Sequence, residues 1–77
     1  MPVADSSANV AHKATALASE STRQTDVAKA IAAGGAVALA IKTAEVAHYN
    51  RLAASALATG VDSAPFVQAA KWVGTHA

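Results

Sequence analysis

The chain has 77 residues, six Lys and Arg against five Asp and Glu, and no cysteine, which limits it to one small domain without disulfides. Its charges are scattered, with a net charge of +1, and do not form the basic stripe that nucleic-acid binding requires. Hydrophobic residues make up 53% of the chain, but 23 of them are alanines, which bury little apolar surface. We therefore expect a single all-α domain over residues 1–77 that gains stability by packing in an oligomer.

The first helix is expected over residues 6–20. Asp5, Ser6 and Ser7 are all suitable N-cap residues. A polar stretch follows, in which Ser21 and Gln24 fit a capping box. Residues 21–25 are therefore either a break or part of a continuous helix. Small residues recur through this region with the spacing of a coiled coil, at Ala4, Ala8, Ala11, Thr15, Ala18, Thr22 and Thr25.

The second helix is expected over residues 26–59, with Gly60 just beyond its C-terminus. Gly34 and Gly35 inside this segment indicate either a hinge or a close backbone contact, because glycine is unfavourable within a helix. The uncharged run from Ala30 to Ile41 is shorter than the roughly 20 residues that span a membrane, which argues against a membrane partner.

The third helix is expected over residues 63–74. Pro65 would lie in its first turn, where proline is tolerated, and Gly74 would end it. Its apolar face consists of Phe66, Ala69, Ala70 and Val73, flanked by Trp72. The three segments together predict an extended, hairpin-like subunit of two or three alanine-rich helices.

Small residues in the second segment form two rows with a spacing of four, which lets helix backbones approach closely. They predict a helix-packing seam made of Ala30, Ala32, Gly34, Ala36, Ala38, Ala40 and Ala44. Larger side chains would act as apolar anchors for neighbouring helices, namely Val10, Leu17, Ile31, Leu39, Leu52, Leu57, Phe66 and Trp72.

The titratable residues do not form a motif for catalysis or for metal binding. Glu45 and His48 make one Glu-x-x-His pair, but helical di-iron sites need two such pairs, and the only other glutamate is Glu20. The chain lacks a cysteine nucleophile, a serine elbow motif and a phosphate-binding loop. We expect a protein that is not an enzyme and that needs no cofactor. Histidine titrates between pH 5 and 8, so His12, His48 and His76 would gain charge on acidification.

The chain resembles subunits of R-bodies, the "killing trait" family. The resemblance lies in Asn9-Val10 and in the alanine-rich stretch 36–47, followed by Asn50, Leu52, Ala53, Ala56, Gly60 and Val61. Glu45, His48 and Tyr49, and the tail after Val61, depart from the family's pattern. The resemblance implies a short protein that assembles into coiled ribbons in the bacterial cytoplasm and extends on acidification. Candidate pH-switch positions would then be His12, Glu45 and His48.

The function expected from these features is that of a structural subunit whose partners are copies of itself in a ribbon, filament or shell. One alternative is a small non-catalytic accessory subunit of a larger complex, with Phe66 and Trp72 as its contact residues. A second alternative is a membrane-active or pilin-like helical peptide. The first 20 residues lack the apolar stretch of a secretory signal, so we expect a cytoplasmic location.

Overall fold

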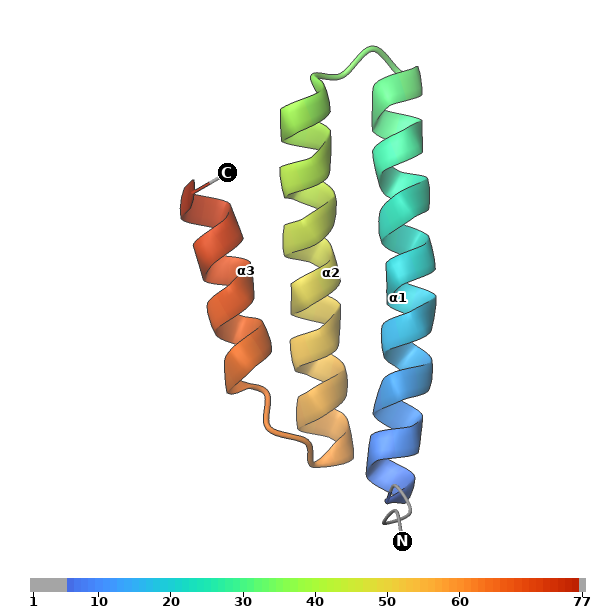
Figure 1. The fold of residues 1–77 in the computed structure, drawn as a ribbon, viewed down its shortest axis with the longest axis vertical. Coiled ribbons are helices and arrows are strands. Elements are labelled where there is room, and N and C mark those ends of the chain that lie inside the picture. Colours follow the sequence, from blue (N-terminus) through green and yellow to red (C-terminus); the bar gives the residue numbers. More distant parts are fainter. Residues whose placement is uncertain (1–5, 77) are drawn as a thin grey trace, which may run out of the picture.

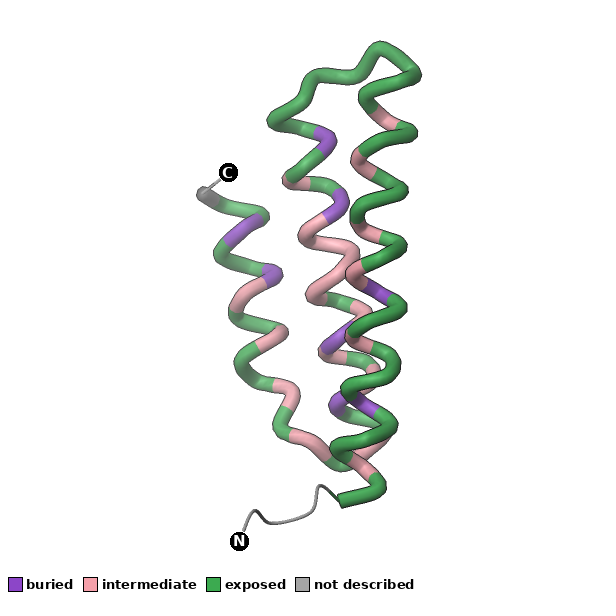
Figure 2. Tube along the Cα trace, turned by 45° about the vertical axis from the view of Figure 1, so that its right-hand side comes forward, coloured by how far each residue is buried: buried purple, intermediate pink, exposed green. Residues whose placement is uncertain are grey.

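The computed structural model describes residues 6–76, which fold into three helices, α1 (Ser7–Ala32), α2 (Val37–Thr59) and α3 (Ala64–His76). The predicted all-α fold is confirmed for this part of the chain. The helices run up, down and up, and α2 lies in the middle and packs against both neighbours (Figure 1). Helix α2 separates α1 from α3 along most of their length (Figures 1 and 2), and the two meet where the rings of His12 and Phe66 lie 5.2 Å apart.

Helix α1 begins at a serine cap and continues through the polar stretch. The Ser6 hydroxyl accepts a hydrogen bond from the Asn9 N–H at 3.1 Å, whereas Asp5 lies outside the described residues. The break considered at residues 21–25 does not occur. The hydroxyls of Thr22 and Thr25 instead donate to the carbonyls of Ala18 and Ser21, each at 3.1 Å, so they are satisfied within a continuous helix.

The prediction of one helix over residues 26–59 is wrong, because the chain reverses direction at Gly34 and Gly35. Gly34 has a φ of +90°, which favours glycine. The Gly35 N–H donates to the Ala30 carbonyl at 2.9 Å, and a Cβ on Gly35 would lie 2.9 Å from that same oxygen. The two glycines therefore form the turn between α1 and α2, and Gly35 makes the close backbone contact that was one of the two expectations.

The ends of α2 and α3 follow the predicted signals in part. Gly60 adopts the expected left-handed conformation after α2, and its N–H donates to the Ala56 carbonyl. Helix α3 begins at Ala64, whose N–H donates to the Asp62 carboxylate at 3.0 Å. The prediction that Gly74 ends α3 is wrong, because the helix continues to His76.

The core of the described chain is thin. Only two of its buried apolar residues are larger than alanine, and the full set is Ala40, Ala44, Leu52, Ala56, Ala70 and Val73. Figure 2 shows these positions on α2 and on the side of α3 that faces it. The face predicted for the third helix is confirmed, since Ala70 and Val73 are buried and Phe66 is half-buried.

Candidate functional site

Two serine–histidine pairs join α1 to α2. His12 on α1 faces Ser55 on α2, with 3.1 Å between Nδ1 and Oγ. Seven residues further along α1, Ser19 faces His48 on α2, with 2.8 Å between Oγ and Nδ1. The two pairs are reciprocal, because the helices are antiparallel and each contributes one serine and one histidine. We call these four residues the Ser–His ladder.

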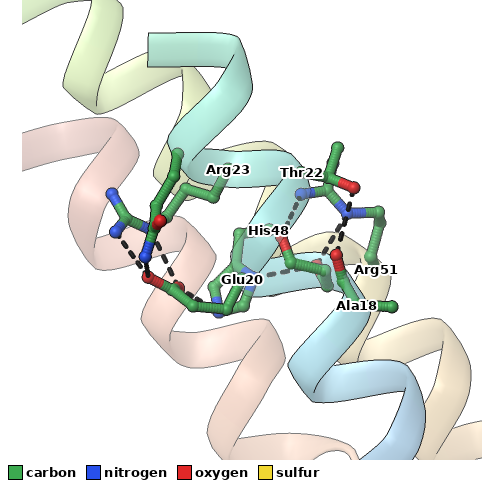
Figure 3. Close-up of polar contacts among 8 residues, drawn as sticks. Ala18, Glu20, Thr22, Arg23, His48 and Arg51 are labelled. Atoms are coloured by element: carbon green, nitrogen blue, oxygen red, sulfur yellow. Dashed lines mark hydrogen bonds and ion pairs between the residues drawn. The ribbon is translucent and has the colours of Figure 1, made fainter. Parts of the chain in front are cut away.

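Arg51 on α2 fixes the direction of one of these hydrogen bonds. Its Nε donates to the Ser19 Oγ at 2.7 Å, and its terminal nitrogen donates to the Ser19 carbonyl at 3.1 Å (Figure 3). The arrangement that satisfies all three side chains has the Ser19 hydroxyl donating to Nδ1 of His48. His48 then carries its hydrogen on Nε2, which lies 3.7 Å from the Glu20 carboxylate.

Glu20 is held as an anion by its own helix. The Nε of Arg23 donates to its carboxylate at 2.9 Å, and Gln24 adds a longer bond at 3.4 Å. The hydrogen bond from Arg23 lowers the pKa of Glu20 to about 2. The same bond raises the pKa of Arg23, and the charge of Glu45 acts in the same direction. A negative charge therefore stands beside His48 throughout the pH range in which histidine titrates.

Ser19, His48 and Glu20 are the residue types of a hydrolytic triad, but the geometry gives Ser19 a structural role. The Ser19 side chain is buried, with 4% of the residue exposed, and its oxygen accepts a hydrogen bond from Arg51. A catalytic serine must present its oxygen to a substrate carbonyl beside an oxyanion hole. In this position the Ser19 hydroxyl instead links α1 to α2.

The first pair of the ladder also reaches α3. His12 is buried, and its ring centroid lies 5.2 Å from that of Phe66. His12 and His48, two of the three candidate pH-switch positions, therefore lie between helices, and Glu45 is half-buried on α2.

Sequence reasoning missed Ser19, Arg51 and Ser55. The available signal was a histidine and a serine seven residues apart in each of two segments.

A shallow apolar groove lies where α1 and α2 meet the connecting turn, and we call it the tip groove. It has a volume of about 300 Å³. Ala40 and Ala44 are buried at this position, whereas Leu39 is largely exposed. The lining residues are Asp26, Ala30, Gly35, Ala36, Leu39, Ala40, Thr43, Ala44 and Ala47.

The structure brings only part of the predicted helix-packing seam together. Ala30, Ala36, Ala40 and Ala44 line the tip groove. The other three seam residues, Ala32, Gly34 and Ala38, are exposed outside it.

Most of the predicted apolar anchors point away from the core. Leu52 is buried and Phe66 is half-buried against His12. The remaining six are exposed and are distributed over all three helices, namely Val10, Leu17, Ile31, Leu39, Leu57 and Trp72.

Within residues 6–76, no group of three or more metal-ligating side chains could hold a metal ion. The helices of this range include none with both the length and the apolar character needed to cross a membrane. Comparison with known protein families, with curated proteins and with solved structures finds no match to this chain.

Proposed function

We propose that this chain is a structural subunit that self-assembles through helix packing into a homopolymer. The observation that carries the proposal is the distribution of the larger apolar side chains in the described residues. Nine of them are exposed, whereas only Leu52 and Val73 are buried. A chain that leaves nine of its larger apolar side chains accessible to water gains free energy when other helices cover them.

The exposed surface area supports the same proposal. The chain exposes 5090 Å². A compact monomer of the same mass is expected to expose about 4300 Å². The chain is elongated, 48 × 23 × 23 Å, and its excess of about 800 Å² is surface that packing against neighbouring helices can bury.

The resemblance to R-body subunits gives the proposal its most specific form, a ribbon in the bacterial cytoplasm. The Ser–His ladder supports a response to pH in that assembly. Protonation puts a hydrogen on Nδ1 of His48, so the hydrogen bond from Ser19 must reverse its direction. Because this bond joins α1 to α2, acidification would change the contact that sets the shape of the hairpin.

Negative-stain electron microscopy and sedimentation velocity of the purified chain test the proposal. Both are run at about pH 7.5 and about pH 5, which include most of the range in which histidine titrates. Ordered ribbons, filaments or shells would support it, and a change of form between the two conditions would support the response to pH. Small particles of monomer mass in both conditions would refute self-assembly and favour an accessory subunit that needs a different chain.

A further inference from the structure

Helix α1 carries a second apolar face, on the side turned away from α2. Val10, Leu17 and Ile31 are the larger side chains of this face, and all three are exposed. At 3.6 residues per turn, Leu17 lies about 140–160° around the helix from His12 and Ser19, which pack against α2. Figure 1 shows α1 at the edge of the molecule, next to α2 alone. The packing of α1 on α2 therefore does not account for this row of apolar residues.

The exposed apolar residues of α1 belong to a seven-residue repeat. Val10, Leu17 and Ile31 occur in one row with this period, and Gln24 fills the remaining position. Small residues form a second row with the same period beside it. We call the two rows the heptad face, and its positions are Ser7, Val10, Ala14, Leu17, Ser21, Gln24, Ala28 and Ile31. Every one of these positions is exposed and uncharged over nearly the whole length of α1.

A seven-residue repeat indicates which kind of partner covers the face. Positions seven residues apart stay in contact with a neighbour only when two helices wind around each other, so the partner is a helix with the same repeat. Among the described helices, α1 is the one that exposes three larger apolar side chains in a single seven-residue repeat. The charged residues Lys13 and Glu20 lie beside the heptad face, and Arg23 balances the charge of Glu20. The helix that matches these features is α1 of a second copy.

The large and small rows determine the direction of the partner helix. In a parallel pair, large residues would meet large ones and small would meet small, which gives layers of unequal thickness. In an antiparallel pair, each large residue meets a small one, and the layers fill evenly. An antiparallel pair centred on residue 19 also leaves no position of the heptad face unmatched. The contacts between the two copies are then Ser7 with Ile31, Val10 with Ala28, Ala14 with Gln24, and Leu17 with Ser21.

We infer that two copies of this chain pair through an antiparallel contact between their α1 helices, at the heptad face. This inference rests on the proposed self-assembly and names one contact of the assembly. Such a pair is two-fold symmetric and closes after two copies, so growth into a polymer would use other exposed side chains, such as Leu39.

Two leucine variants with matched exposure test the use of the heptad face. Leu17 is 76% exposed and belongs to the face, whereas Leu57 is 77% exposed and lies on α2. We expect Leu17→Lys to raise the dimer dissociation constant at least about tenfold in sedimentation equilibrium, because it places a charge in the contact. We expect Leu57→Lys to leave that constant within about twofold of the wild-type value. Far-UV circular dichroism would verify that both variants keep their helices.

The outcomes separate this inference from the proposed function. A wild-type chain that stays monomeric overturns both. Assembly that persists unchanged in Leu17→Lys, or that weakens equally in both variants, overturns the α1 contact and leaves self-assembly standing.

Cysteine cross-linking tests the antiparallel direction. The chain has no cysteine, so the single variants Val10→Cys and Ala28→Cys each report one position. The two positions lie roughly 27 Å apart along α1. We expect disulfide-linked dimers when the two variants are mixed and oxidised, and none when either variant is oxidised alone. Cross-linking of each variant with itself would show a parallel pair, and a mixture without cross-links would show that the heptad faces do not meet; either result overturns the inference.

Discussion

Replacing Ser19 by alanine should weaken the packing of α1 on α2 more than replacing Ser55. The Ser19 hydroxyl contacts both Nε of Arg51, at 2.7 Å, and Nδ1 of His48, at 2.8 Å. Within residues 6–76, the Ser55 hydroxyl has one hydrogen-bond partner, Nδ1 of His12, at 3.1 Å. Ser19→Ala therefore removes one charge-assisted and one neutral hydrogen bond between the helices, and Ser55→Ala removes a single neutral one.

The expected magnitudes follow from these contacts. A hydrogen bond to a charged group contributes about 1.5–3 kcal/mol, and a neutral one about 0.5–1.5 kcal/mol. Alanine returns roughly 0.5 kcal/mol because it is a better helix former than serine. We expect Ser19→Ala to lower the free energy of unfolding by about 2 kcal/mol and Ser55→Ala by about 0.5 kcal/mol. For a domain of this size the first value is a large part of the total stability.

Urea unfolding followed by circular dichroism at micromolar concentration measures both values. Ser21→Ala is the matched control, because Ser21 is exposed on the same helix and reports the gain in helix propensity alone. If Ser55→Ala cost as much as Ser19→Ala, the assignment of two interhelical bonds to Ser19 would be wrong.

Three further predictions concern the core, the turn between α1 and α2, and the loss of stability at low pH. Leu52→Ala should lower the free energy of unfolding by about 2–5 kcal/mol in the same urea assay, because Leu52 is a large buried side chain in a thin core; a cost below that of a surface variant would contradict this. Gly35→Ala should lower the melting temperature, by roughly 4–8 °C per kcal/mol of strain, because its Cβ would meet the Ala30 carbonyl at 2.9 Å; an unchanged melting temperature would contradict the turn geometry. The folded pKa of Glu20, about 2, lies below its ordinary value of 4.5, so its ionised form stabilises the fold above pH 4.5 and this contribution is lost as the pH falls towards 2. The melting temperature of Glu20→Gln should therefore decrease less than that of the wild-type chain over this pH range. An equal decrease in both would contradict the role of Glu20.

Local signals predicted the helix ends better than they predicted helix continuity. Ser6 and Gly60 act at helix ends as their residue types indicate, because capping depends on one or two neighbouring residues. The sequence left both a break and a continuous helix open at residues 21–25, because serine and threonine can also cap a helix. Their hydroxyls can equally donate to a carbonyl four residues earlier, and nothing in the sequence decides between these two options.

The packing face of α1 could not be predicted from the spacing of small residues. Alanine is so frequent that it forms a periodic row on more than one face of the helix. The predicted row includes Ala11, Thr15 and Ala18, all of which are exposed. The face that packs against α2 carries His12 and Ser19, because a serine on one helix satisfies a histidine on the other and both can then be buried.

The Ser–His ladder also explains how an alanine-rich hairpin selects one register. Alanine rows repeat every turn, so sliding α1 along α2 changes apolar packing very little. A slip of seven residues would place His12 against His48 and Ser19 against Ile41, and it would leave the buried hydroxyl without its partners. Leaving such groups unpaired costs about 1–3 kcal/mol each, which is enough to exclude the slipped register.

This reasoning predicts the behaviour of the double variant Ser19→Ala with Ser55→Ala. Because the alanine seams remain, we expect its helical content by circular dichroism to stay close to that of the wild-type chain. Because the hydrogen bonds that distinguish the registers are gone, we expect more than one set of backbone amide peaks in a ¹H–¹⁵N correlation spectrum. A single set of peaks at wild-type positions would show that apolar packing alone fixes the register, and the ladder would then contribute stability without specificity.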